Sequence, residues 1–323
     1  MTKQLARLEQ HAQTLTRQDA ERIRDYAAAG VAENTRRAYT AQARAFERWA
    51  DGRNLEPLAA LTDQGLAAYL ADRADQGASP ATLSQAVAAL RKAASAAGSA
   101  DPYGNGAQAV LRGIRRSGTA QGRGQVQGIR WADLEGAAVL AAAEGTAAGL
   151  RDAAMLRLGS DALLRVSELA AVRVADLEQE ADGSGRLTVR RSKTDQDGKG
   201  ATLYVGAPTM RAIRKWQDAA SVADGPLFRR VWGRSATVGE DAVSARTARR
   251  VIQRRAEAAG LEGRISGHSL RVGSAQDLAS AGAELTELMN AGRWQSPAMP
   301  AHYARGQLAG RGAVARLRYG AGK

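Results

Sequence analysis

The stretch GRLTVRRSKTDQDGKGATLYVG, residues 185–206, decides the fold class of this chain. Leu187 and Val189 alternate with polar residues, and so do Leu203 and Val205, which is the period-two pattern of half-buried strands. The polar segment between the two pairs is rich in Gly, Asp and Lys and indicates a hairpin turn. A small antiparallel sheet is therefore expected, in a chain whose other segments favour helices.

The segments on either side of this hairpin indicate two domains. Residues 1–118 carry helical patterns without a strand signal, and two of the helices open at Thr62 and at Ser79, which are typical N-terminal caps. The Gly- and Gln-rich stretch 119–128 indicates an exposed linker. Helices surround the small sheet in residues 129–323. We expect a mainly α protein with a helical first domain and an α+β second domain.

The chain is strongly basic, with 46 Lys and Arg against 33 Asp and Glu and a formal net charge of +13. A charge of this size attracts polyanions. A GC-rich coding bias explains a preference for Arg over Lys, but it does not explain the excess of cations over acids. We therefore expect a nucleic-acid partner.

Composition also excludes several kinds of site. The chain has no cysteine, so disulfides, thiol catalysis and Cys-ligated zinc are excluded. His11, His268 and His302 are too scattered to suggest a metal cluster, and no metal or cofactor is expected. No apolar run approaches the ~20 residues of a membrane span, and the N-terminus lacks the apolar stretch of a signal peptide. We expect a soluble, cytoplasmic protein with no membrane partner.

Two fragments carry cations suited to binding an oxyanion. In GHSLRVGS, His268 and Arg271 are three residues apart, so both point the same way if a helix starts there. The alternative is an ordinary surface pair. In LLRVSELAAV, Arg165 lies among apolar residues, where a charge needs a partner or a ligand. Glu168, one turn later, allows a simple intrahelical ion pair instead.

The stretch GRWQSPAMPAHYARG, residues 292–306, contains a candidate nucleophile, Tyr303. A phenol with a pKa of about 10 needs bases and cations nearby to attack at neutral pH. The embedded arginines and a histidine can supply that help. Lys193 and Lys199 flank the predicted hairpin turn and either protonate a leaving oxygen or are simply solvated. This set of groups suits phosphoryl transfer without a metal ion.

Four segments resemble, in order, the conserved boxes of the tyrosine recombinase, or phage integrase, family. They are ALLRVSEL at 162–169, SGHSLRVGSAQDLASAG at 266–282, ELMNAGRW at 287–294 and HYAR at 302–305. The resemblance is strong over about 155–305 and weaker, but in register, in the first domain. It implies a helical core-binding domain and an α+β catalytic domain that together form a clamp around DNA, and it implies site-specific recombination.

The resemblance also implies a role for each matching residue. Arg165 and Arg271 would hold the scissile phosphate, and Glu168 would brace the active-site arginine. His268 would hydrogen-bond the phosphate and help to accept the tyrosine proton. Trp294 stands where many family members have a second histidine. Its indole nitrogen is a donor only, so it can hold a phosphate oxygen but cannot carry a proton.

By the same resemblance, Tyr303 would form a 3′-phosphotyrosine and release a 5′-hydroxyl. Lys193 would protonate the departing oxygen, although the length of the turn leaves Lys199 as an alternative. Tyr319 is a competing nucleophile, but it lies beyond the matching segment. His302 would be a neighbour of the nucleophile rather than a catalytic group.

A second group of basic residues indicates DNA contacts. The segment 243–260 has the pattern of an amphipathic helix, with arginines away from its apolar face. The family resemblance implies that this helix enters the major groove of DNA, where arginine commonly pairs with guanine. The 79–98 helix of the first domain would be the other major-groove element. The alternative is a solvated basic face. The candidate contacts are Ser244, Arg246, Arg249, Arg250, Arg91, Lys92, Arg36 and Arg37.

The family further implies a tetramer on two double-stranded DNA sites with inverted repeats, a Holliday-junction intermediate, and a monomer without DNA. The tail after residue 310, with Val314 and Leu317 as apolar groups, would pack on the next subunit or on its own domain. Two other functions stay open. One is DNA relaxation of the type IB topoisomerase kind, and the other is sequence-specific DNA binding without catalysis.

Overall fold

The computed structural model describes residues 33–118, 124–190, 200–232 and 237–309, with a few isolated positions near the two ends. The chain divides into two compact units, residues 1–124 and 125–323, and the break falls inside the stretch where the sequence predicts a linker. Gln127 and Ile129 already belong to the second unit, because their backbone N–H groups donate to the carbonyls of Arg264 and Ser269.

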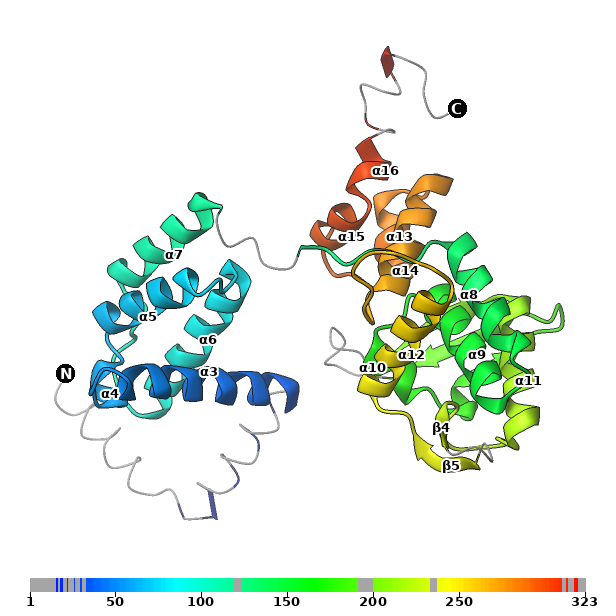
Figure 1. The fold of residues 1–323 in the computed structure, drawn as a ribbon, viewed down its shortest axis with the longest axis horizontal. Helices are drawn as coiled ribbons and strands as arrows, with labels where there is room; N and C mark the ends of the chain where they lie inside the picture. The colour runs from blue at the N-terminus through cyan, green and yellow to red at the C-terminus, as the bar shows by residue number, and fades with distance from the viewer. Residues whose placement is uncertain are drawn as a thin grey trace, which may run out of the picture. The chain divides into compact units, whose positions relative to one another are not determined.

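The described part of the first unit is built from helices (Figure 1). They are α3 (Glu33–Asp51), α4 (Pro57–Ala60), α5 (Asp63–Asp75), α6 (Pro80–Ala96) and α7 (Asn105–Ser117). The predicted caps are confirmed: Thr62 accepts a hydrogen bond from the Gly65 amide at the start of α5, and Ser79 accepts one from the Thr82 amide at the start of α6.

Three aromatic rings join α3 to α5 in the core of the first unit. Phe46, Trp49 and Tyr69 have ring centroids 5.2–5.5 Å apart. The Trp49 indole N–H donates to Asp72 at 2.7 Å, so this polar atom is satisfied. Contacts of this kind add about 0.5–1.5 kcal/mol per aromatic pair to the effect of burial.

The second unit is mainly helical with two small antiparallel sheets. Its helices are α8 (Trp131–Ala143), α9 (Ala147–Asp161), α10 (Val166–Ala171), α11 (Ala207–Ala220), α12 (Ala245–Ala258), α13 (Ser269–Ala281), α14 (Leu285–Gly292), α15 (Ala298–Tyr303) and α16 (Arg305–Ala309), with a 3-10 turn η1 (Val174–Asp176). Helix α9 packs against both α8 and α11, and α13 packs against α14 (Figure 1). The buried face of α9 therefore supplies much of the core.

The predicted hairpin is confirmed as strands β2 (Gly185–Val189) and β3 (Ala201–Val205), which pair antiparallel with Leu187 opposite Leu203. A short strand β1 (Leu177–Gln179) extends this sheet. The sequence did not predict the second sheet, β4 (Arg229–Trp232) and β5 (Thr237–Ala242). These two strands are largely exposed and lack the alternation of apolar residues that identifies a half-buried strand.

Several expectations lie outside the described residues. They concern the turn with Lys193 and Lys199, Val314 of the tail, and the alternative nucleophile Tyr319. Leu317 is described and is 79% exposed. No helix in the described part of the chain is both long and apolar enough to cross a membrane.

Candidate active site and DNA interface

Arg165 is placed by the strained turn that joins α9 to α10. Leu163 in this turn has φ of 44°, a conformation that L residues rarely adopt. Arg165 then caps α10, and its Nη1 donates to Oε1 of Glu168 at 2.7 Å. Glu168 Oε2 accepts from the Arg165 backbone N–H at 2.9 Å. The intrahelical pair that the sequence allows is therefore formed, and it fixes the Arg165 side chain.

Arg271 lies on α13 and is 2% exposed. Its Nη1 donates to the carbonyl of Leu163 at 2.6 Å, and its Nη2 donates to the carbonyl of Gly292. Its guanidinium carbon lies 4.2 Å from the centroid of the Trp294 ring, which is a cation–π contact. These contacts hold a buried cation at the junction of three segments that are far apart in the sequence.

Trp294 connects the arginine to the candidate nucleophile. Its ring centroid is 5.8 Å from that of Tyr303, at the end of α15. The close packing of the indole requires a glycine at position 292, because a Cβ there would lie 2.0 Å from the indole ring. Arg271, Trp294 and Tyr303 thus form one cluster.

A third arginine, which the sequence analysis did not single out, joins the same cluster. Arg293 Nη2 donates to Oε2 of Glu168 at 2.6 Å, so each oxygen of this carboxylate is bound by a different guanidinium. The GRW segment gives no hint of this pairing, because its partner is 125 residues away in the chain.

Burial and positive charge shift the titration of the cluster. Burial, followed by the neighbouring cations of Arg165 and Arg293, lowers the pKa of Arg271 to about 10. Burial also raises the pKa of the Tyr303 phenol, and the cations of Arg271 and Arg165 oppose that rise. At neutral pH the site therefore holds a neutral phenol beside crowded cations, an arrangement that suits the binding of an anion.

The remaining catalytic candidates are less constrained by the structure. His268 is exposed and directly precedes α13, one turn before the buried Arg271. Its backbone N–H donates to the Ser266 hydroxyl at 3.2 Å. Lys193 lies outside the described residues. The structure therefore brings together Arg165, Glu168, Arg271, Trp294 and Tyr303. The catalytic roles of these five residues, and those of His268 and Lys193, stay predictions.

Comparison with known proteins identifies the family of this chain. The pattern of the phage integrase family matches residues 134–308, and the phage integrase N-terminal SAM-like domain matches residues 25–97. The first of these matches covers more than half of the chain. The chain belongs to the phage integrase family. It is thus an enzyme of the tyrosine recombinase class.

Individual relatives agree with this assignment. An integrase/recombinase XerD homologue of Selenomonas ruminantium is 30% identical over 286 residues, covering 84% of this chain and 81% of that protein. The recombinase Cre of Escherichia phage P1 is 28% identical over 228 residues, covering 66% of each chain.

Among solved structures, the Tn1549 transposon integrase in complex with circular intermediate DNA has a TM-score of 0.61. It is 15% identical and covers 91% of this chain and 98% of its own. A lambda integrase dimer bound to a core site has a TM-score of 0.57 at 18% identity, covering 88% and 93%. At these identities the solved structures show a shared fold.

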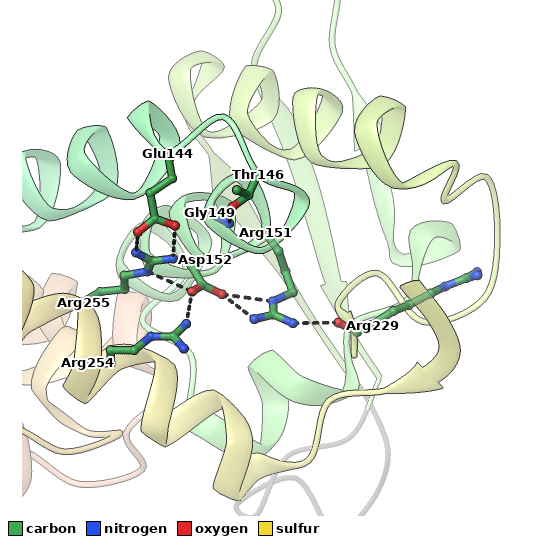
Figure 2. A network of polar contacts seen from close by, with 8 residues as sticks. All are labelled: Glu144, Thr146, Gly149, Arg151, Asp152, Arg229, Arg254 and Arg255. Carbon is green, nitrogen blue, oxygen red and sulfur yellow. Dashed lines mark hydrogen bonds and ion pairs between the residues drawn. The ribbon is translucent and has the colours of Figure 1, made fainter. Parts of the chain in front are cut away.

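The candidate recognition helix of this integrase, α12, is fixed by a network of charges around Asp152 on α9 (Figure 2). The carboxylate of Asp152 is fully buried and accepts from Arg151 at 2.7 Å, from Arg254 at 2.6 Å and from Arg255 at 2.9 Å. Arg255 also binds both oxygens of Glu144, next to the start of α9. Sequence reasoning missed this network, although the charged pair Arg151–Asp152 directly before the apolar residues AAML was a signal for it.

The predicted contacts on α12 lie near its N-terminus. Ser244 caps the helix by accepting from the Thr247 amide at 3.1 Å, so its hydroxyl is already engaged. Arg246, Arg249 and Arg250 are exposed. Between α12 and β4 lies a hollow of about 680 Å³, lined by Arg151, Arg230, Val231, Trp232, Thr247, Arg250, Val251 and Arg254. Among the residues that the structure describes, its lining contains no carboxylate, which suits a polyanion.

The predicted contacts on the first unit are partly paired with acids. Arg91 binds Asp101 through Nε at 2.9 Å and through Nη2 at 2.5 Å. Arg36 and Arg37 both bind Glu33. Lys92 is exposed. A DNA contact by any of these arginines would have to compete with its carboxylate, whereas Lys92 pairs with no carboxylate in the described part of the chain.

Proposed function

We propose that this integrase is a site-specific DNA recombinase in which Tyr303 is the nucleophile. The phenol oxygen forms a bond to the scissile phosphorus, the bond from phosphorus to the 5′ oxygen breaks, and a 3′-phosphotyrosine and a free 5′-hydroxyl result. The observation that supports this proposal is the meeting of Tyr303 with Trp294, Arg271 and the Arg165–Glu168 pair in one cluster.

Each neighbour of the phenol has a part in the proposed reaction. Arg165 and Arg271 neutralise the equatorial oxygens, on which negative charge increases in the transition state. Trp294 donates its indole N–H to one of these oxygens. His268 accepts the phenol proton, and Lys193 protonates the leaving 5′ oxygen. Because arginines supply the positive charge, the proposed reaction uses neither a metal ion nor ATP.

The proposed partner is double-stranded DNA with an inverted-repeat target site, bound by the two domains as a clamp. Residues 1–118 would be the core-binding domain and residues 129–323 the catalytic domain, with the tail packing on the next subunit. Strand exchange would pass through a Holliday junction in a tetramer assembled on two sites from monomers, in the cytoplasm. One of the structural relatives is a lambda integrase tetramer bound to a Holliday junction, which supports this assembly.

The test is capture of the covalent intermediate. Duplexes bound by the protein are first selected from a random pool. The selected duplex is then nicked at successive positions, so that a cleaved 5′-hydroxyl fragment diffuses away and the adduct accumulates. The wild-type chain should form an adduct in EDTA as fast as in Mg²⁺. Tyr303→Phe should bind the same duplex and form none, and an adduct with this variant would refute the proposal.

The same preparation separates the two open alternatives. A supercoiled plasmid that lacks the selected site should stay supercoiled, because only a topoisomerase-like enzyme would relax it. Failure of the wild-type chain to form any adduct with its selected duplex would instead indicate a DNA-binding protein without catalysis.

A further inference from the structure

Arg293 has a backbone conformation that glycine adopts more easily than any other residue. It follows the last residue of α14 with φ of 54° and ψ of 46°, in the left-handed region. An L side chain is disfavoured there, and glycine is the usual residue at such a helix end. The contacts of the arginine side chain must therefore account for its presence at this position.

The side chain turns into the cluster around Glu168 rather than into solvent. It is 10% exposed, and it donates to Glu168 Oε2 at 2.6 Å and to the carbonyl of Ala162 at 3.3 Å. Its Nε is buried without a hydrogen-bond partner among the described residues. Burial lowers the pKa of Arg293. The positive charge of Arg293 is thus buried at a cost in solvation, and the ion pair with Glu168 offsets part of that cost.

This pairing changes what Glu168 does to Arg165. Oε1 of the carboxylate binds Arg165, and Oε2 binds Arg293. With Arg165 as its sole cation, the carboxylate would neutralise that guanidinium. With two cations on one carboxylate, the Glu168 side chain is held from both sides. Part of the positive charge of Arg165 then stays available to another anion.

We propose that Arg293 is a positioning residue for DNA cleavage. It fixes Glu168 from the side opposite to Arg165, so that the Arg165 guanidinium is held in place and its charge remains available to the scissile phosphate. Arg293 acts through Glu168 and does not itself touch the phosphate. This inference rests on the proposed function of the cluster.

The first test compares Arg293→Gly with a matched control, Ser221→Gly. Ser221 ends α11 with φ of 52°, so the control makes the same backbone change outside the cluster. In single-turnover cleavage of the nicked selected duplex, Arg293→Gly should be slower by about 10–100-fold, the size of loss seen when a residue that orients a metal ligand is removed. Its affinity for the uncleaved duplex and its melting temperature should stay near those of the control.

Arg293→Lys should cleave at an intermediate rate, because a lysine keeps the charge but lacks the planar fork of the guanidinium. If Arg293→Gly fails to fold, Arg293→Met takes its place, because methionine keeps an apolar stem without the charge. Cleavage by the folded uncharged variant at the wild-type rate would overturn the proposal.

A double-mutant cycle with Glu168→Gln tests whether Arg293 affects cleavage through the Glu168 carboxylate or by direct contact with the phosphate. If Arg293 acts through the carboxylate, Arg293→Gly should slow cleavage much less in the Glu168→Gln background than in the wild-type chain. An equal slowing in both backgrounds would show that Arg293 acts on the phosphate directly and would overturn the positioning role. Absence of any adduct with the wild-type chain is a different result, since it refutes the proposed function itself.

Discussion

The Arg271 guanidinium lies over the Trp294 indole, with its carbon 4.2 Å from the ring centroid. The same indole packs against Tyr303 on the following helix. One aromatic ring therefore sets the position of both the buried cation and the phenol. Any change that moves this ring should disturb both groups together, and this relationship can be tested.

Replacing Arg271 by lysine should remove most of the cleavage activity. A lysine cannot reach both the Leu163 and Gly292 carbonyls while it covers the indole, and it lacks the second donor face for a phosphate. We expect a loss of about 10²–10³-fold in single-turnover cleavage. Arg186→Lys, on the exposed surface of β2, is the control and should cleave like the wild-type chain. Similar rates for both variants would contradict a phosphate-holding role.

Replacing Gly292 by alanine should displace the indole. The added Cβ would lie 2.0 Å from the Trp294 ring, so the ring must move and carry its contacts with it. We expect slower cleavage with little loss of affinity for the uncleaved duplex. Gly306→Ala is a matched control, because no atom lies within 4 Å of a Cβ at that position. The measurement is the rate of adduct formation by the two variants. Equal rates would contradict the expectation that the position of the Trp294 indole controls cleavage.

The phenol of Tyr303 should titrate above the ordinary tyrosine pKa of about 10. Burial is the cause, because it disfavours the phenolate. A raised pKa in the folded state favours the protonated form, so its contribution to stability is complete below pH ~10 and is lost as the pH rises through the shifted value. NMR of ring-labelled tyrosine, with Tyr303→Phe to assign the resonance, measures it. A midpoint below the ordinary value would contradict the buried phenol.

Replacing Asp152 by asparagine should destabilise the second unit. The change leaves Arg151 and Arg255 buried without their shared carboxylate, and breaking a buried ion pair costs about 3–5 kcal/mol. The free energy of unfolding, measured with urea, should fall by this order. DNA binding should weaken as well, because Asp152 holds α12 through two arginines. Asp224→Asn, at a carboxylate that is 96% exposed, should change neither quantity.

The sequence predicted those features that depend on neighbouring residues. The caps at Thr62 and Ser79 and the β2–β3 hairpin follow from patterns a few residues long, and the structure confirms them. The segments that resemble the family also contain Arg271 and Trp294, which lie in contact in the structure. Strands β4 and β5 were missed because exposed strands lack an apolar alternation.

The amino-acid sequence by itself determined the fold class, the basic character and the residues that suit phosphoryl transfer. Only the tertiary structure decided which charges share a partner. Arg293 and Glu168 are 125 residues apart, and Arg255 and Asp152 are 103 apart. Hydrophobic periodicity reports which face of a helix is buried, but the pairing of two distant charges depends on how the helices pack, and no local pattern records it.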